Sequence, residues 1–255
     1  MSADLQYTPD EMMTIAASRK LRNGDVCFVG IGKPSAAANL ARITHAPGVV
    51  LIYESGTIGA KPDVLPLSIG DGELADHAET VVSVPEIFRY WLQGGRVDVG
   101  FLGAAQIDKF ANLNTTVIGG TYEKPKVRLP GAGGAPEIAS GGKEIWIIAN
   151  HSKRTFVDKL DFCTSAAGNS KSKRAPTTVI TDLGVMVADP VTGELTLTAL
   201  HPGIAVEQAK EATGWNLQVV DQLNQTAPPT IDELTALRDL YKRTAAAHGT
   251  SGEAD

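Results

Sequence analysis

A glutamate that directly follows a run of apolar residues is the sharpest candidate for chemistry in this sequence. Glu54 comes after the run 49–53, and Ser55 and Gly56 follow it. A carboxylate beside such low-dielectric surroundings needs hydrogen-bond donors. The hydroxyl of Ser55 and two backbone amides lie close along the chain, and Gly56 leaves open space. The alternative is a strand-end glutamate that is exposed to water or paired with a lysine or arginine.

A second candidate is the glycine-rich stretch Gly131–Ala135, which contains Gly133 and Gly134. Closely spaced glycines let a backbone approach a ligand, and their amides can converge on a developing oxyanion. A flexible surface loop is the alternative interpretation.

Gly30 and Gly32 form a third candidate, a turn between an apolar run and an alanine-rich segment. Its amides and the start of the following helix could bind an anion. Pro34 and Ser35 stand where the dinucleotide fingerprint continues, and its third glycine is missing, so this turn is only weak support for a nicotinamide cofactor. A purely structural tight turn is the other possibility.

The remaining polar clusters carry less chemistry. Asp71, Glu73, Asp76 and His77 lack the alternating oxygen ligands of a calcium loop, and an ordinary acidic loop explains them as well. The five histidines show no ligand spacing, so we expect no metal site. The basic loop with Lys171, Lys173 and Arg174, like Lys153 and Arg154, is either solvated or placed to meet phosphates of a ligand. Cys27 and Cys163 fit neither a metal clamp nor a disulfide framework, and both are expected to be reduced core thiols.

The helices and strands that must position these residues follow one another in the order typical of α/β proteins. A capping sequence at Thr8–Glu11 begins a helix that should stop at Asn23–Gly24, and 230–233 begins the last helix in the same way. Between them we expect strands at 26–29, 49–53, 97–102, 144–149, 179–187 and 195–200, and helices at 35–44 and 85–93. The first strand, turn, helix and second strand form a βαβ unit, and 190–193 is typical of a hairpin turn.

This order predicts the α/β class, with an open, mostly parallel sheet flanked by helices and an added antiparallel element. We expect one domain over residues 1–248 and a flexible tail over 249–255. Ligands of such sheets bind beyond the carboxyl ends of the strands, and Glu54 lies at such an end.

Composition narrows the classes of function. The 255 residues carry a net charge of −6, which gives no general attraction to nucleic acid or to an anionic membrane. No apolar run approaches the roughly 20 residues that span a bilayer. The first five residues lack the basic and apolar regions of a signal peptide, so we expect a cytoplasmic protein.

Several segments, taken in order, resemble the β subunit of family I CoA transferases. They are the turn 30–34 with 38–41, the stretch Tyr53–Gly56, the stretch Val99–Asp108 with 112–116, Arg128–Ala135, Arg154–Val157 and Leu200–Gly203. The resemblance covers about nine-tenths of the chain, and an ordered set is more specific than any single motif. The stretches 54–72, 87–92 and 244–249 are most similar to members that act on dicarboxylic 3-oxo acids.

The resemblance implies that Glu54 is the nucleophile and that no cofactor is permanently bound, with a coenzyme A thioester as substrate. It places Gly134 as an oxyanion donor, Gly56 as steric room, and Gly133, Ala135 and Ser55 close to CoA. It also implies a separately encoded α subunit, succinyl-CoA as donor and 3-oxoadipate as acceptor, in the catabolism of aromatic compounds. Glutaconate or another dicarboxylate as acceptor, a CoA-ester hydrolase on the same fold, and a noncatalytic binding subunit remain open at this point.

Overall fold

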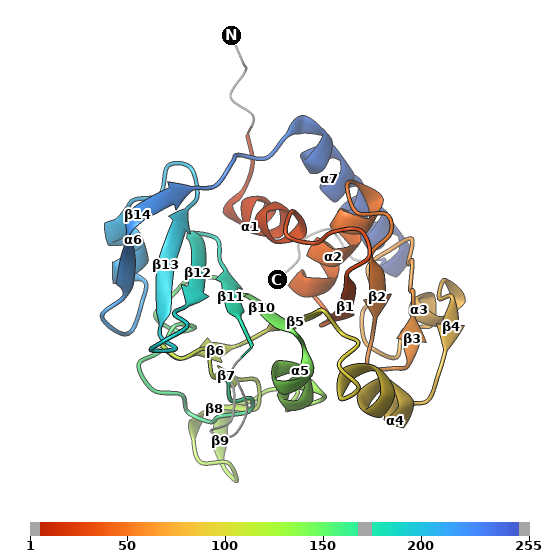
Figure 1. The fold of residues 1–255 in the computed structure, drawn as a ribbon, viewed down its shortest axis with the longest axis horizontal. Helices are drawn as coiled ribbons and strands as arrows, with labels where there is room; N and C mark the ends of the chain where they lie inside the picture. The colour runs from red at the N-terminus through yellow and green to blue at the C-terminus, as the bar shows by residue number, and fades with distance from the viewer. Residues whose placement is uncertain (1–5, 168–174, 250–255) are drawn as a thin grey trace.

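A sheet of ten strands crosses the computed structural model, which describes residues 6–167 and 175–249 (Figure 1). Its central strands are parallel neighbours, in the order β11 (Thr177–Ile180), β10 (Glu144–Ile148), β5 (Val99–Gly103), β1 (Val26–Val29) and β2 (Val50–Ile52). Short antiparallel strands extend one edge, β3 (Thr57–Ile58) and β4 (Thr80–Val81). The other edge continues through β12 (Gly184–Ala188), β13 (Leu195–Leu200) and β14 (Gln218–Gln225). The predicted fold class is therefore confirmed.

Helices cover both faces of this sheet. On one face, α1 (Pro9–Ser18) and α2 (Lys33–Ile43) pack small and apolar side chains against β1, β2, β5 and β10. On the other face, the π-helix η1 (Ile87–Leu92) and α5 (Ala135–Gly141) pack against the same strands. Glu54 leaves the sheet at the end of β2, so its surroundings come from both the sheet edge and the η1–α5 face.

The last helix joins the two ends of the described chain. The helix α7 (Ile231–His248) lies beside α1 and α2 (Figure 1), and Leu234 and Leu237 share a buried cluster with Ile15 and Leu40. Both predicted capping boxes are present, at Thr8 and at Thr230. The last described residue, Gly249, ends α7 in the left-handed conformation, and the rest of the predicted tail lies outside the described residues.

Smaller elements complete the fold. They are α3 (Gly72–Asp76), α4 (Val84–Glu86), α6 (Val206–Glu211), the pair β6 (Gln106–Ile107) and β7 (Leu113–Asn114), and the pair β8 (Val117–Gly120) and β9 (Pro125–Arg128). None of the strands β6 to β9 was predicted, because none of them contains an apolar run like that of β1 or a sustained alternation.

Two predicted elements differ in detail from the structure. The strand expected at 179–187 is two antiparallel strands, β11 and β12, because Thr181 forms a tight turn with Gly184. The first helix ends at Ser18, well before the predicted stop at Asn23–Gly24. The hairpin predicted around 190–193 does join β12 to β13.

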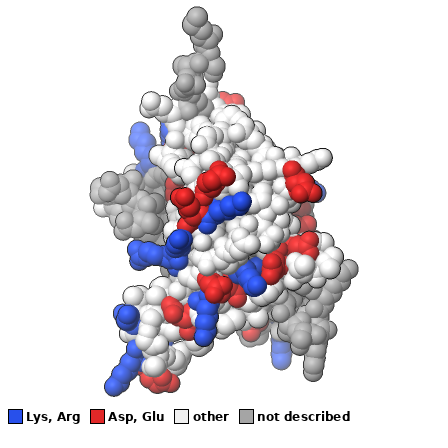
Figure 2. All heavy atoms as spheres, turned by 90° about the vertical axis from the view of Figure 1, so that its left-hand side faces the viewer, with Lys and Arg blue, Asp and Glu red and all other residues white. Residues whose placement is uncertain are grey.

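The surface over β13, β14 and α6 carries interleaved acidic and basic side chains (Figure 2). On this face, the described residues form no broad surface of a single charge. Within residues 6–167 and 175–249, no helix combines the length and the apolar character that crossing a membrane requires.

Candidate active site

Tyr53 anchors the end of β2 just before Glu54. Its ring is fully buried, and its hydroxyl lies 3.0 Å from the Ser35 hydroxyl and accepts a hydrogen bond from the Asn39 side chain at 3.2 Å. Burial raises the pKa of Tyr53 to about 12, against the opposing effect of these two hydrogen bonds. Tyr53 is therefore a neutral anchor that ties the end of the strand to α2.

A tight turn then brings Glu54 to the surface of the sheet edge. The Gly56 amide donates to the Tyr53 carbonyl at 3.0 Å, and the Tyr53 amide donates to the Thr57 carbonyl at 3.1 Å. Gly56 has a φ of +104°, and a Cβ there would lie 1.9 Å from the Val82 carbonyl oxygen. Only glycine fits this position, so Gly56 is required by the geometry of the turn whatever its role in the chemistry.

The glycine-rich stretch meets Glu54 although 80 residues separate them. The Gly134 amide donates to Glu54 Oε1 at 2.8 Å. A Cβ on Gly133 would lie 3.3 Å and 3.4 Å from the two carboxylate oxygens, so this backbone passes close to the whole carboxylate. Thr115 fixes the turn, with its hydroxyl donating to the Gly131 carbonyl at 2.8 Å. The structure thus brings together two candidates that the sequence could only treat separately.

Glu54 and Gly134 line a cleft of about 540 Å³. Its other walls are residues from the turn after β2, the loop before α3, α4 and η1 with its C-cap, the glycine-rich turn and α5: Ser55, Ile69, Val84, Pro85, Phe88, Arg89, Gln93, Gly133 and Glu137. The Ser55 hydroxyl oxygen is buried and has no hydrogen-bond partner among the described residues. The cleft therefore offers a carboxylate and a directed N–H in one place, and the unpartnered Ser55 hydroxyl is buried next to them along the chain.

Not every predicted site residue reaches this cleft. The Ala135 amide donates to the Ala132 carbonyl at 3.0 Å, which is a bond within its own turn. Gly30 and Gly32 lie beside a separate hollow of about 250 Å³, which Ile31 and Lys33 of the same turn help to line. The Gly30 amide is already bonded to the Phe101 carbonyl at 2.8 Å. The predicted anion-binding role of that turn stays a prediction.

The basic loop with Lys171, Lys173 and Arg174 lies outside the described residues.

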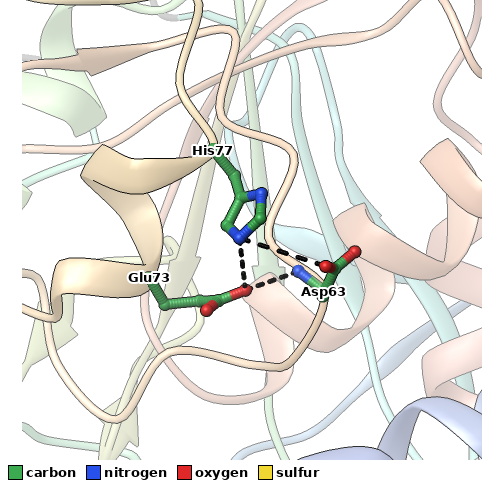
Figure 3. Close-up of side chains that lie close together, drawn as sticks. All are labelled: Asp63, Glu73 and His77. Atoms are coloured by element: carbon green, nitrogen blue, oxygen red, sulfur yellow. Dashed lines mark hydrogen bonds and ion pairs between the residues drawn. The ribbon is translucent and has the colours of Figure 1, made fainter.

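The acidic loop after Lys61 brings Asp63, Glu73 and His77 together (Figure 3). His77 Nε2 lies 3.7 Å from Glu73 Oε1 and 4.0 Å from Asp63 Oδ2. Glu73 Oε1 already accepts the Asp63 amide at 2.6 Å, and Asp71 caps α3 by accepting the Glu73 amide at 3.1 Å. These carboxylates therefore hold the loop closed, which supports the interpretation of an ordinary acidic loop.

Two of the histidines, His151 and His201, and one of the two cysteines, Cys27, are buried in the core. His151 is buried between the hydroxyls of Thr213, at 2.9 Å, and Thr181, at 3.4 Å, and it stacks on Phe156. Burial lowers its pKa to about 4, so it is neutral at physiological pH. Burial also raises the pKa of the Cys27 thiol. The prediction that Cys163 is a core thiol is wrong, because this side chain is exposed.

Several cleft residues were missed from the sequence, above all Phe88, Arg89 and Gln93. Arg89 and Gln93 lie four residues apart in a segment that was predicted to be helical, with Pro85 four residues earlier. That spacing places all three on one side of a helix and was the available signal. It does not identify them by itself, because nothing in the sequence says which side of this helix faces Glu54.

Comparison with known proteins assigns a family to this arrangement. The family model described as coenzyme A transferase matches residues 10–212. The B subunit of the 3-oxoadipate CoA-transferase of Pseudomonas knackmussii is 61% identical over 96% of this chain and 98% of its own length. The B subunit of the glutaconate CoA-transferase of Acidaminococcus fermentans is 34% identical over 87% of this chain and 88% of its own length.

Solved structures agree with these sequence matches. The crystal structure of the Acidaminococcus fermentans glutaconate CoA-transferase superposes with a TM-score of 0.83 at 30% identity, covering 92% of this chain and 94% of the matched chain. The decarboxylase AibA/AibB superposes with a TM-score of 0.81 at 26% identity, covering 96% of this chain and 99% of the matched chain. Enzymes with another reaction thus share the fold, so function has to be argued from the site. By sequence and by fold, the chain belongs to the coenzyme A transferase family.

Proposed function

We propose that this chain is the β subunit of a heteromeric enzyme that transfers CoA from succinyl-CoA to 3-oxoadipate, with Glu54 as the nucleophile. The observation that carries the proposal is the Glu54 carboxylate at the wall of an open cleft, with the Gly134 N–H directed at Oε1 from 2.8 Å. The acceptor comes from the name of the relative in Pseudomonas knackmussii, which matches over nearly the full length of both chains.

Covalent catalysis overcomes the low reactivity of a free carboxylate towards a thioester. A Glu54 oxygen attacks the succinyl carbonyl carbon, and the C–S bond breaks, so that CoA leaves as a thiolate and a mixed anhydride remains. The thiolate then attacks the glutamyl carbonyl carbon of this anhydride. The C–O bond to the succinyl group breaks, succinate leaves, and Glu54 carries CoA as a thioester. No proton is consumed in either step.

The acceptor reverses this sequence. The carboxylate of 3-oxoadipate attacks the glutamyl thioester and displaces the CoA thiolate, which then attacks the 3-oxoadipyl side of the new anhydride. The products are 3-oxoadipyl-CoA and the free Glu54 carboxylate. One acyl activation is exchanged for another, so the balance requires no external energy source.

The position of the Gly134 N–H supports a role at one of the two oxyanions. It already bonds to a glutamate oxygen, so it meets the oxyanion that forms on the glutamyl carbon when the thiolate attacks there. The oxyanion on the substrate carbonyl needs a different donor. The unpartnered Ser55 hydroxyl is the nearest candidate along the chain, and a group from a partner chain is another.

A partner chain is supported by the surface around the cleft. Large apolar side chains with 41% to 66% exposure lie on the segments that form and flank it: Leu67, Ile69, Val81, Val84 and Tyr90. Exposed apolar groups gathered in one region are typical of a protein interface. A separately encoded α chain that covers this region would also exclude water, which would otherwise hydrolyse the anhydride.

Chemical trapping tests the proposal directly. The αβ complex is mixed with succinyl-CoA and then treated with borohydride, which reduces a glutamyl thioester to an alcohol and releases CoA. Peptide mass spectrometry is expected to locate the reduced residue at Glu54. A modification on another residue, or none, would refute the nucleophile. Rapid loss of succinyl-CoA without any acceptor would instead identify a CoA-ester hydrolase.

A further inference from the structure

Arg89 is a positively charged side chain that shares the cleft with Glu54. It lies on η1, and it is the one lysine or arginine among the described residues that line this cleft. No described residue forms a hydrogen bond or ion pair with its guanidinium group, and neither carboxylate of the cleft, Glu54 or Glu137, makes an ion pair with it. The cation is therefore available to a ligand.

Two other arginines, one close to Arg89 in sequence and one far from it, have the hydrogen-bond partners that Arg89 lacks. Arg96, close by in sequence, stacks on the Tyr90 ring at 3.8 Å and donates to the Tyr90 carbonyl at 2.7 Å. Arg19 donates to the Glu233 carboxylate and to two backbone carbonyls. Among the described residues, the Arg22 guanidinium is unpaired like that of Arg89, but it lines a different hollow. An unpaired arginine is thus not rare in this protein, and its place beside Glu54 is what distinguishes Arg89.

The backbone around Arg89 also differs from an ordinary helix. The Gln93 amide donates to the Phe88 carbonyl at 2.8 Å, a bond across five residues that defines the π-helical turn. Single π-helical turns occur frequently at functional sites. Here the turn places Arg89 and Gln93 on the wall of the same cleft, and the Phe88 ring lies against Gly134. A planar fork and an amide together suit a carboxylate group.

Two anionic parts of the substrates could reach an arginine, and their chemistry places them differently. The phosphates of CoA are separated from its sulfur by the whole pantetheine arm, whereas the distal carboxylate of a succinyl or 3-oxoadipyl group is only a few carbon atoms from the reacting carbonyl. Arg89 shares one cleft of about 540 Å³ with the nucleophile. The distal carboxylate is the group that this proximity favours.

We propose that Arg89, with Gln93, binds the distal carboxylate of the dicarboxylic acyl group and so selects dicarboxylic over monocarboxylic substrates. This inference rests on the proposed function. The apolar walls formed by Ile69, Val84 and Pro85 then contact the methylene groups between the two ends of the acid.

The test uses the assembled αβ complex with Arg89→Gln and Arg89→Lys, and with Arg22→Gln as the matched removal of an unpaired arginine elsewhere. Succinate and free CoA are used as product inhibitors, since each reports the binding of one half of the substrate. Arg89→Gln is expected to raise the inhibition constant of succinate about 30- to 100-fold, because a charge-assisted hydrogen-bond pair is lost. The inhibition constant of CoA is expected to stay within about two-fold, and Arg89→Lys is expected to recover part of the loss. Arg22→Gln should change neither constant.

Each outcome decides the proposal. An equal rise of both inhibition constants would assign Arg89 to CoA or to the fold, and unchanged constants would show that it binds nothing in the reaction. Failure of the complex to assemble in size-exclusion chromatography would assign Arg89 to the interface with the α chain. If borohydride still labels Glu54 in any of these cases, the role of Arg89 is wrong and the proposed function stands. If Glu54 is not labelled in the wild-type complex, the proposed function itself has failed.

Discussion

The cleft around Glu54 and the contact between α1 and α7 differ in whether their polar and charged side chains have hydrogen-bond or ion-pair partners. Between the helices, the Arg19 guanidinium meets the Glu233 carboxylate at 2.6 Å through two hydrogen bonds and donates to the Ala227 and Pro228 carbonyls. In the cleft, the Arg89 guanidinium and the buried Ser55 hydroxyl have no partner among the described residues. The Arg19 and Glu233 side chains have their hydrogen-bond partners between the helices, whereas the Arg89 and Ser55 side chains of the cleft have none among the described residues.

The difference separates stability from activity. A satisfied ion pair with hydrogen bonds holds two elements together, and removing one partner leaves the other uncompensated. An unsatisfied polar group in an open cleft contributes little to folding and instead lowers the free energy of a bound ligand or transition state. Substitutions in the cleft should therefore change turnover at nearly constant stability, and substitutions between α1 and α7 should do the reverse.

The largest effect is expected for Glu54→Ala. Loss of the nucleophile removes both covalent intermediates, so kcat should fall by at least about 10³-fold. The unfolding midpoint in urea should stay close to that of the wild type, because the Glu54 side chain accepts a hydrogen bond only from Gly134 among the described residues. Glu137→Ala is the matched control in the same cleft and should change kcat by no more than a few-fold. Comparable losses in both variants would remove the distinction between the two carboxylates.

The second prediction concerns the donor to Glu54. A Cβ on Gly134 would lie 2.4 Å from the Phe88 ring and 2.8 Å from Glu54 Oε1, so Gly134→Ala must displace the N–H, the ring or the carboxylate. Removal of one directed donor costs about 3 kcal/mol of transition-state stabilisation, or about 10²-fold in kcat. Steady-state kinetics should show this loss. Gly72→Ala, where a Cβ meets nothing within 4 Å, should leave kcat unchanged.

Sequence reasoning identified the residues of this cleft unevenly, for physical reasons. Glu54, Ser55 and Gly56 were identified because an apolar strand ending in a carboxylate and a glycine is a local pattern. Gly134 was identified as part of a glycine-rich turn, but its contact with Glu54 depends on how α5 packs against β5 and η1, which no local pattern encodes. Arg89 was missed for the same reason.

The fold shows the same division. The βαβ unit and the two capping boxes were predicted correctly, since each depends on residues that are close in sequence. The turn at Thr181–Gly184 was hidden because Val179–Val187 reads as one apolar strand, although Asp182 and Gly184 are typical of a turn. The hydrogen bonds between the Thr181 hydroxyl and the Gly184 backbone that close the turn cannot be read from the sequence.

The third prediction tests a buried group that the mechanism does not use. Burial lowers the pKa of His151 from its ordinary value of 6.5 to about 4, so the unfolded chain binds more protons than the folded one between these values. Stability is complete above about pH 6.5 and should decrease by about 3 kcal/mol as the pH falls towards 4. The pKa of His201 is lowered by burial as well and adds to this slope. Urea unfolding of the wild type and of His151→Gln at a series of pH values measures the effect.

His151→Gln should have a shallower dependence of unfolding free energy on pH than the wild type. Its activity at neutral pH, per folded molecule, should be unchanged, because His151 does not line the cleft. An unchanged slope would mean that His151 is not the buried group responsible.

The smallest of these effects is expected for Glu233→Gln, on the satisfied side of the comparison. Burial alone would raise the pKa of Glu233, but the hydrogen bonds from Arg19 and Thr230 outweigh it and lower the pKa to about 2. The carboxylate therefore stabilises the fold fully above about pH 4.5 and loses this effect as the pH falls towards 2. Because solvent screens a partly exposed group, the loss in Glu233→Gln should be about 2 kcal/mol rather than the full value of the shift.

Asp239→Asn on the same helix is the control, since Asp239 pairs with Arg243 at the surface and should contribute about 0.5 kcal/mol or less. Unfolding free energies of both variants, together with the kcat of the folded αβ complex, show whether each substitution changes stability or turnover. If Glu233→Gln lowered kcat without lowering stability, α7 would be coupled to the cleft. The loop that carries Ile69 would be the connection, because the Thr244 hydroxyl of α7 accepts the Leu65 amide at 2.9 Å. Stability lost at constant kcat would instead show that the pair of Glu233 with Arg19 stabilises the fold and takes no part in turnover.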